Sequence, residues 1–175
     1  GTLTLGWFSL AHRVLVAPLG LISVSAGQVF FNELSRKVRI GDTGVFRFVS
    51  KFALGLGVLS VIIFLPFLIA GPLIFKLFFG SSWQQAGEYA QIVSLGLMLR
   101  FVVSPLSMAL VALNGERALS IWQVLYFCSC LFLAYLSRNQ SIETFLRYYT
   151  VNDICMYSIY LSIILYYSFS FDRGA

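Results

Sequence analysis

Residues 52–75 read FALGLGVLSVIIFLPFLIAGPLIF, and no charged side chain interrupts this stretch. At a rise of about 1.5 Å per residue, a helix of this length crosses a hydrocarbon layer about 30 Å thick. The apolar residues run continuously and do not alternate with polar ones, which favours a helix over a strand of a membrane barrel. The stretch therefore predicts a membrane-spanning helix.

The charged residues divide the rest of the chain into four more stretches of similar character. Together with the first, they predict five transmembrane helices, at about residues 4–31, 52–78, 86–113, 118–137 and 145–168. Residues 114–117 join the third and fourth helices in a turn short enough to make these helices antiparallel neighbours. The expected fold class is all-α, a polytopic transmembrane helix bundle.

The composition excludes several other classes of protein. Hydrophobic residues make up 59% of the 175 residues and charged residues 11%, whereas soluble domains are about one quarter charged. A water-soluble fold of this size could not bury so much apolar surface. The net charge of +5 does not indicate a nucleic-acid partner, because too little polar chain remains to build a basic groove. The chain opens with Gly1 in an apolar stretch, which we interpret as a fragment of a longer protein.

The lysines and arginines predict the orientation of the bundle. Five of them lie in residues 32–51, and Arg117 and Arg173 fall on the same side, against three on the opposite side. Because basic residues gather on the cytoplasmic side, the N-terminus is expected outside and the C-terminus inside. Residues 32–51 then form a cytoplasmic link, either a short amphipathic helix on the membrane surface or a solvated loop.

Three charged residues that lie within the predicted helices are candidates for a site: Arg13, Arg100 and Asp153. A charge inside a membrane usually faces the interior of the bundle or a watery cavity. Both arginines lie on helix faces of mostly small or polar residues, and Ser104 and Ser107 continue the face of Arg100. Counted from the outer helix ends, the three charges lie at similar depths, so they could share one level of the bundle.

Two interpretations of these charges stay open. In the functional one, Arg13 and Arg100 bind an anionic headgroup, and Asp153 organises the site or binds a coupling ion. In the structural one, Asp153 pairs with an arginine, or the arginines extend to the outer interface. The adjacent His12 is interpreted as a packing residue. The sequence contains no catalytic constellation, metal-ligand spacing or cofactor motif, so we expect neither an enzyme nor a bound metal or cofactor.

Two stretches carry a resemblance to a known family. Residues 6–18, GWFSLAHRVLVAP, resemble a helix of polysaccharide flippases that reads Gly-aromatic-x-x-x-Ala-x-Arg-Leu-x-x-x-Pro. Its continuation, residues 28–35, is similar to the end of that helix, although Asn32 stands where the family usually has proline. Residues 79–86, FGSSWQQA, are similar to the family's outer turn Phe-Gly-x-x-Trp-x-x-Ala, at which Gly80 is expected to end a helix with a positive φ.

The resemblance covers most of the chain and points to lipid-linked oligosaccharide flippases of the multidrug/oligosaccharidyl-lipid/polysaccharide exporter superfamily, which include O-antigen and lipid II flippases. It implies two six-helix lobes around a central cavity, with this chain as the last five helices of the C-terminal lobe. The implied function is translocation of an undecaprenyl-diphosphate-linked oligosaccharide across the cell inner membrane by alternating access. The implied partners are that lipid, the bilayer and the missing N-terminal lobe. Arg13 matches the family's cavity arginine, which implies contact with the lipid diphosphate, and His12 replaces the negative residue that some relatives carry before it.

Three alternative functions stay open. A drug exporter of the same superfamily would be expected to line its cavity with carboxylates, whereas the buried charge here leans positive. A membrane-embedded polysaccharide polymerase or glycosyltransferase would need a large aqueous loop, and residues 32–51 offer only Glu33 and Asp42 as acidic groups. A purely structural membrane subunit is compatible with any bundle of this composition.

Overall fold

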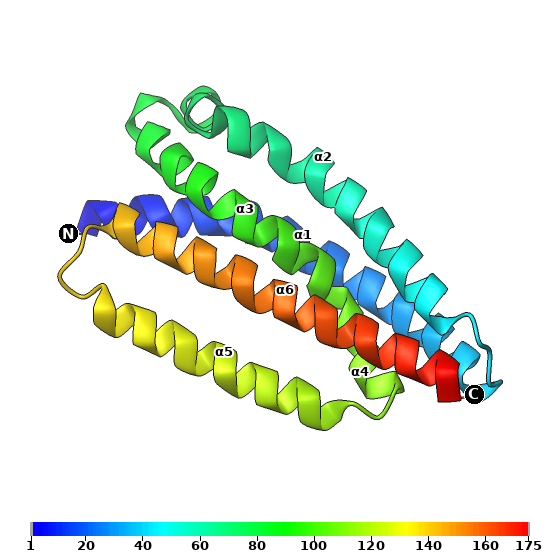
Figure 1. Cartoon of the computed structure of the whole chain (residues 1–175). Helices are drawn as coiled ribbons and strands as arrows, with labels where there is room; N and C mark the ends of the chain where they lie inside the picture. The colour runs from blue at the N-terminus through cyan, green and yellow to red at the C-terminus, as the bar shows by residue number, and fades with distance from the viewer. Residues whose placement is uncertain (1, 175) are drawn as a thin grey trace.

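The computed structural model describes residues 2–174, and the side chains of this range except those of residues 2–5, 18 and 19. The described chain is helical without any strand, which confirms the expected all-α class. Its elements are α1 (Thr2–Arg39), α2 (Val45–Phe79), the 3-10 turn η1 (Ser81–Trp83), α3 (Gln84–Leu106), α4 (Met108–Ala112), α5 (Glu116–Leu136) and α6 (Ile142–Gly174). Successive long helices run in opposite directions, and the two ends of the chain lie at opposite ends of the bundle (Figure 1).

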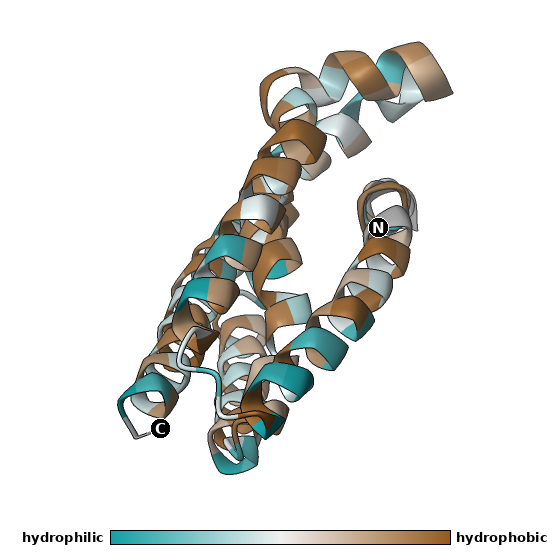
Figure 2. Ribbon diagram, turned by 90° about the vertical axis from the view of Figure 1, so that its right-hand side faces the viewer, coloured by the Kyte–Doolittle hydropathy of each residue, from teal (hydrophilic) through white to brown (hydrophobic). Residues whose placement is uncertain are grey.

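The surface of the bundle is suited to lipid. Five segments are long and apolar enough to cross a membrane: residues 6–39, 45–79, 81–112, 116–136 and 142–174. Large apolar side chains such as Ile62, Leu77 and Phe127 are exposed along these segments, which would be unfavourable in water. The chain is therefore a multi-pass membrane protein. Hydrophilic residues gather near the end that carries the C-terminus, while long hydrophobic stretches lie between the two ends (Figure 2).

The helix α3 lies at the centre of the bundle. It packs against α1, α2 and α6, and half of an apolar 18-residue stretch of the span 81–112 is buried, against 6% of such a stretch of α5. Small side chains let the neighbouring helices approach it closely. The small buried residues of α3 are Ala86, Gly87, Ala90, Ser94 and Gly96.

The connections between helices differ from the expected ones. Because α1 continues to Arg39 and α2 begins at Val45, residues 32–51 are mostly the ends of two helices, and neither a separate surface helix nor a loop. The short α4 redirects the chain after α3, so α5 packs against α6 and not beside α3 as expected. Stacking of the rings of Trp122 and Tyr160, with centroids 4.0 Å apart, holds α5 there. The expected helix end at Gly80 is confirmed, with φ at 94°.

A kink in α2 depends on a hydrogen bond from α3. The backbone leaves helical geometry at Ala70, close to Pro72. Because Pro72 has no N–H, the carbonyl oxygen of Leu68 loses its helical partner. The side-chain amide of Gln91 donates a hydrogen bond to that oxygen at 2.6 Å, so the kink leaves no unsatisfied carbonyl at Leu68.

Two glycines bring α2 and α3 into backbone contact beside this kink. A Cβ atom on Gly87 would lie 2.5 Å from the carbonyl oxygen of Gly71, and a Cβ atom on Gly71 would lie 2.5 Å from the carbonyl oxygen of Gly87. No side chain fits at either position without moving a helix. The pair therefore fixes the distance between the two helices at this end of the bundle.

Candidate functional site

A cavity of about 240 Å³ lies where α1, α3 and α6 meet. Arg100 of α3 and Asp153 of α6 line it, together with His12 of α1 and Tyr149 of α6. The other lining residues are apolar: Phe8, Val93, Leu97, Phe145 and Leu146. The structure thus brings together two of the three charged residues that the sequence indicates.

Asp153 is held by hydroxyl groups. Only 1% of its surface is exposed, and the hydroxyl of Tyr126 on α5 donates a hydrogen bond to its Oδ1 at 2.8 Å. The hydroxyl oxygens of Tyr126 and Tyr149 lie 3.2 Å apart. Because a hydroxyl carries one hydrogen, Tyr149 is the donor in this second bond. The carboxylate therefore has a partner that is not a cation.

Close packing of α3 on α6 sets the position of this carboxylate. A Cβ atom on Gly96 would lie 3.1 Å from the Cβ of Asp153 and 3.6 Å from the Cα of Thr150. Gly96 lies one helical turn before Arg100 on the same face of α3. The absence of a side chain at Gly96 therefore lets Asp153 approach the helix that carries Arg100.

Arg100 is half-buried on the wall of the same cavity and has no ion pair there. Among the side chains that the structure describes, the ion pairs within 4.0 Å join Arg36 to Glu33 and Lys37 to Asp42. The structural interpretation, an ion pair of Asp153 with an arginine, is thus not found among these residues. A guanidinium stays charged in apolar surroundings, so it needs water or an anion as its partner.

The structure does not bring Arg13 into the cavity. Its side chain is exposed, on a part of α1 whose other small residues, Ser9, Ala17 and Gly20, are exposed as well. A step of one residue turns a helix by about 100°, so His12 lines the cavity while Arg13 points elsewhere. Pro18, which belongs to the stretch that resembles the flippase helix, lies outside the described side chains.

Two further cavities continue from Arg100 between α1 and α3. One, of about 200 Å³, is lined by Arg100, Ser104 and Ser23. The next, of about 410 Å³, is lined by Ser23, Ser104, Ser107 and Gln28. The hydroxyl of Ser107 donates to the carbonyl oxygen of Ser104 at 2.7 Å. Ser104 and Ser107, which the sequence places on the face of Arg100, thus lie in the walls of these cavities.

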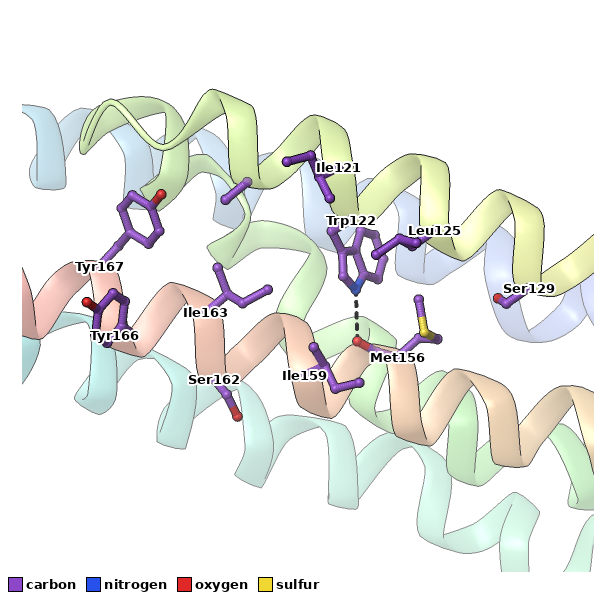
Figure 3. A pocket seen from close by; sticks show the side chains of 11 residues that line it. Ile121, Trp122, Leu125, Ser129, Met156, Ile159, Ser162, Ile163, Tyr166 and Tyr167 are labelled. Atoms are coloured by element: carbon purple, nitrogen blue, oxygen red, sulfur yellow. Dashed lines mark hydrogen bonds between the residues drawn. The ribbon is translucent and has the colours of Figure 1, made fainter.

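A larger groove, of about 810 Å³, lies between α5 and α6 and is chemically different (Figure 3). Its lining residues include no charged side chain. The indole N–H of Trp122 donates to the carbonyl oxygen of Met156 at 2.9 Å, so this donor is already satisfied. We interpret the groove as an apolar, lipid-facing seam of the bundle.

The sequence does not single out Tyr126, which holds Asp153, or Gln91, which bonds at the kink of α2. Each is a polar side chain within an apolar span, and each bonds to a neighbouring helix. A polar residue within an apolar stretch of sequence could have indicated both contacts, because a polar group in hydrocarbon must find a partner. His12, interpreted as a packing residue, lies in the cavity wall with Arg100.

Comparisons of the chain with protein-family models, curated proteins and solved structures found no match. The chemistry of the site is therefore argued from its own residues. Among the described residues, no group of three or more His, Cys, Asp or Glu side chains is placed to hold a metal ion. The cavities offer a guanidinium without a carboxylate partner, a carboxylate held by tyrosines, and serine and glutamine groups that can bind hydroxyls or water.

Proposed function

We propose that the protein is part of a transporter that moves an undecaprenyl-diphosphate-linked oligosaccharide across the cytoplasmic membrane by alternating access. In this proposal the chain belongs to the C-terminal lobe of a two-lobe flippase and is not an enzyme. The observation that carries the proposal is Arg100, a half-buried guanidinium without a described carboxylate partner that lines two adjoining cavities.

The geometry around Arg100 suits a diphosphate. The planar guanidinium can bind phosphate oxygens through two parallel hydrogen bonds. Partial burial strengthens this attraction, because the effective dielectric constant near a buried group is lower than that of water. Ser23, Ser104 and Gln28 along the adjoining cavities offer donors and acceptors for sugar hydroxyls.

Arg13 supplies a second cation in this proposal. The part of α1 that carries it, with Ser9 and Ala17 on the same face, is exposed among the described residues. In a two-lobe arrangement this face borders the central cavity, where the arginine meets water and the lipid diphosphate. The resemblance of residues 6–18 to a flippase helix supports this assignment.

Electrostatics favour this proposal over a drug exporter of the same superfamily. A cationic drug needs a carboxylate that no nearby cation offsets, but Asp153 shares its cavity with Arg100. Arg100 also lines the second cavity, which Asp153 does not line, so its positive charge repels a cation there. An anionic headgroup is attracted by the same positive charge.

The test is complementation of surface polysaccharide in the native strain after removal of the gene. Loss of the protein is expected to stop polysaccharide export and to leave the lipid-linked oligosaccharide on the cytoplasmic face. Arg13→Ala and Arg100→Ala should restore no export, while Arg13→Lys and Arg100→Lys should restore part of it, because lysine keeps the charge but lacks the planar fork. Arg147→Ala, at an exposed arginine of α6 outside the cavities, is the control and should restore full export. Normal surface polysaccharide without the gene would refute the proposal.

A further inference from the structure

Three cavities follow one another along α1. The first is the cavity of Arg100 and Asp153, whose wall includes Phe8, and the third reaches Phe31. Neighbouring cavities share wall residues, which are Leu97 and Arg100 between the first and second, and Ser23, Val24 and Ser104 between the second and third. The three therefore adjoin, with volumes of about 240, 200 and 410 Å³.

The row of cavities is long enough to cross a membrane. Phe8 and Phe31 lie 23 residues apart on α1, which is a single helix. At about 1.5 Å per residue this is about 35 Å, and the hydrocarbon core of a bilayer is about 30 Å thick. The cavities thus follow α1 through the whole apolar thickness.

Polar side chains accompany the cavities along this length. His12, Arg100, Ser23 and Gln28 line successive parts of the row, and Ser104 and Ser107 lie opposite on α3 and beyond its end. The volume of each cavity is larger than the volume that one molecule occupies in liquid water, about 30 Å³. Each cavity also has several polar side chains that can bond to water. The groove between α5 and α6 differs from the row because none of its lining residues is charged.

Arg100 lies at the junction of the first two cavities, since it lines both. Asp153 lines the first cavity but not the second, so Arg100 is the charged residue in the wall of the second cavity. An anion that enters the second cavity therefore meets a positive charge, whereas a cation is repelled there. Arg100 is the charged group shared by these two cavities.

We propose that the three cavities hold water in a row along α1 and form a crevice within this bundle, which admits anions and excludes cations through Arg100. The crevice takes phosphate-bearing or sulfonate-bearing groups with hydroxylated neighbours. Its use as the route of the lipid diphosphate rests on the proposed function, whereas its selectivity for anions does not.

The test measures the accessibility of single cysteines in the complete protein, purified and reconstituted into liposomes without cargo. Cys128, Cys130 and Cys155 are first replaced by serine. Ser23→Cys then probes the crevice, and Ser162→Cys on the α5–α6 groove is the matched control. The two serines lie at similar depth, because Ser23 is 15 residues after Phe8 and Ser162 is 17 residues after Phe145, and both phenylalanines line the first cavity.

The probes are an anionic methanethiosulfonate reagent that carries a sulfonate and a cationic one that carries a quaternary ammonium. Ser23→Cys is expected to react with the anionic reagent about tenfold faster than Ser162→Cys does, and about tenfold faster than with the cationic reagent. Adding Arg100→Gln should abolish the preference for the anion. Adding Arg100→Lys should keep it, which separates loss of charge from loss of folding.

Each outcome bears on one part of the proposal. Equal reaction rates at Ser23→Cys and Ser162→Cys would overturn the aqueous crevice. A preference for the anion that persists in Arg100→Gln would overturn the role of Arg100. Anion-selective labelling in a protein whose removal leaves polysaccharide export normal would refute the flippase function and leave the crevice standing.

Discussion

Arg100 and Asp153 line one cavity without forming an ion pair. Opposite charges in apolar surroundings usually pair, because an isolated buried charge is costly. Here the hydroxyl of Tyr126 satisfies the carboxylate, and the guanidinium is left for water or an anion. The two residues therefore do not form a structural salt bridge in this structure.

A double substitution tests whether the two residues are independent. Arg100→Gln is expected to lower transport by at least about tenfold, the equivalent of one hydrogen bond to a charged group, with little change in thermal stability in detergent. Adding Asp153→Asn should leave transport at the lowered level, because no ion pair has been broken. Rescue of transport and stability by the double variant would show that the two residues form a structural pair in the membrane.

Gln91 is expected to stabilise the kink of α2 through the carbonyl oxygen of Leu68. Gln91→Leu should lower the free energy of unfolding by about 1 kcal/mol, a typical value for a hydrogen bond between membrane helices. In a Pro72→Ala background the same change should cost less, because the introduced alanine supplies the N–H that this carbonyl lacks. Thermal unfolding of the four proteins measures the coupling, and strictly additive effects would argue against this role.

The contact between Gly71 and Gly87 predicts intolerance of side chains at these positions. Gly87→Ala is expected to destabilise the protein by about 1–3 kcal/mol, because the new methyl group overlaps the backbone of α2. Gly55→Ala in the middle of α2 is the control, since its Cβ would meet nothing within 4 Å and alanine favours a helix. Equal stability of the two variants would contradict the close approach of α2 and α3.

Asp172 of α6 caps the start of α2. The N–H groups of Val45 and Phe46 each donate to one oxygen of its carboxylate at 3.0 Å, and Gly44 offers no side-chain cap. Asp172→Ala is therefore expected to cost about 1 kcal/mol and to speed amide hydrogen exchange at residues 45 and 46. Ser170→Ala, at an exposed neighbour, should leave the exchange unchanged. Slow exchange in Asp172→Ala would show that the cap does not hold this end of the bundle.

The sequence predicts the fold class well, because the length of each apolar stretch alone identifies a membrane helix. It also predicts the helix end at Gly80, where the pattern of a glycine after an apolar run has a direct backbone cause. Such patterns do not predict which helix α5 packs against. Short connections favour neighbouring helices, but the stacking of Trp122 on Tyr160 decides the partner of α5, and no spacing along the chain encodes that contact.

The candidate site is predicted only in part for a similar reason. Depth along a helix can be counted from the sequence, and Arg100 and Asp153 do meet at one level. The direction of a side chain around the helix depends on which neighbours cover it. The stripe of small residues suggests an inward face for Arg13, yet in the structure Arg13 is exposed and it is His12 that lines the cavity.

The most direct test of the central claim is transport by the purified complete protein in liposomes. The vesicles contain the radiolabelled undecaprenyl-diphosphate oligosaccharide of the native strain, and an added glycosidase removes sugar only from the outer leaflet. With the wild-type protein, the cleaved fraction should rise with time from about one half towards completion, and Arg100→Gln should slow this rise by at least about tenfold. A cleaved fraction that stays at the level of protein-free vesicles would contradict the account.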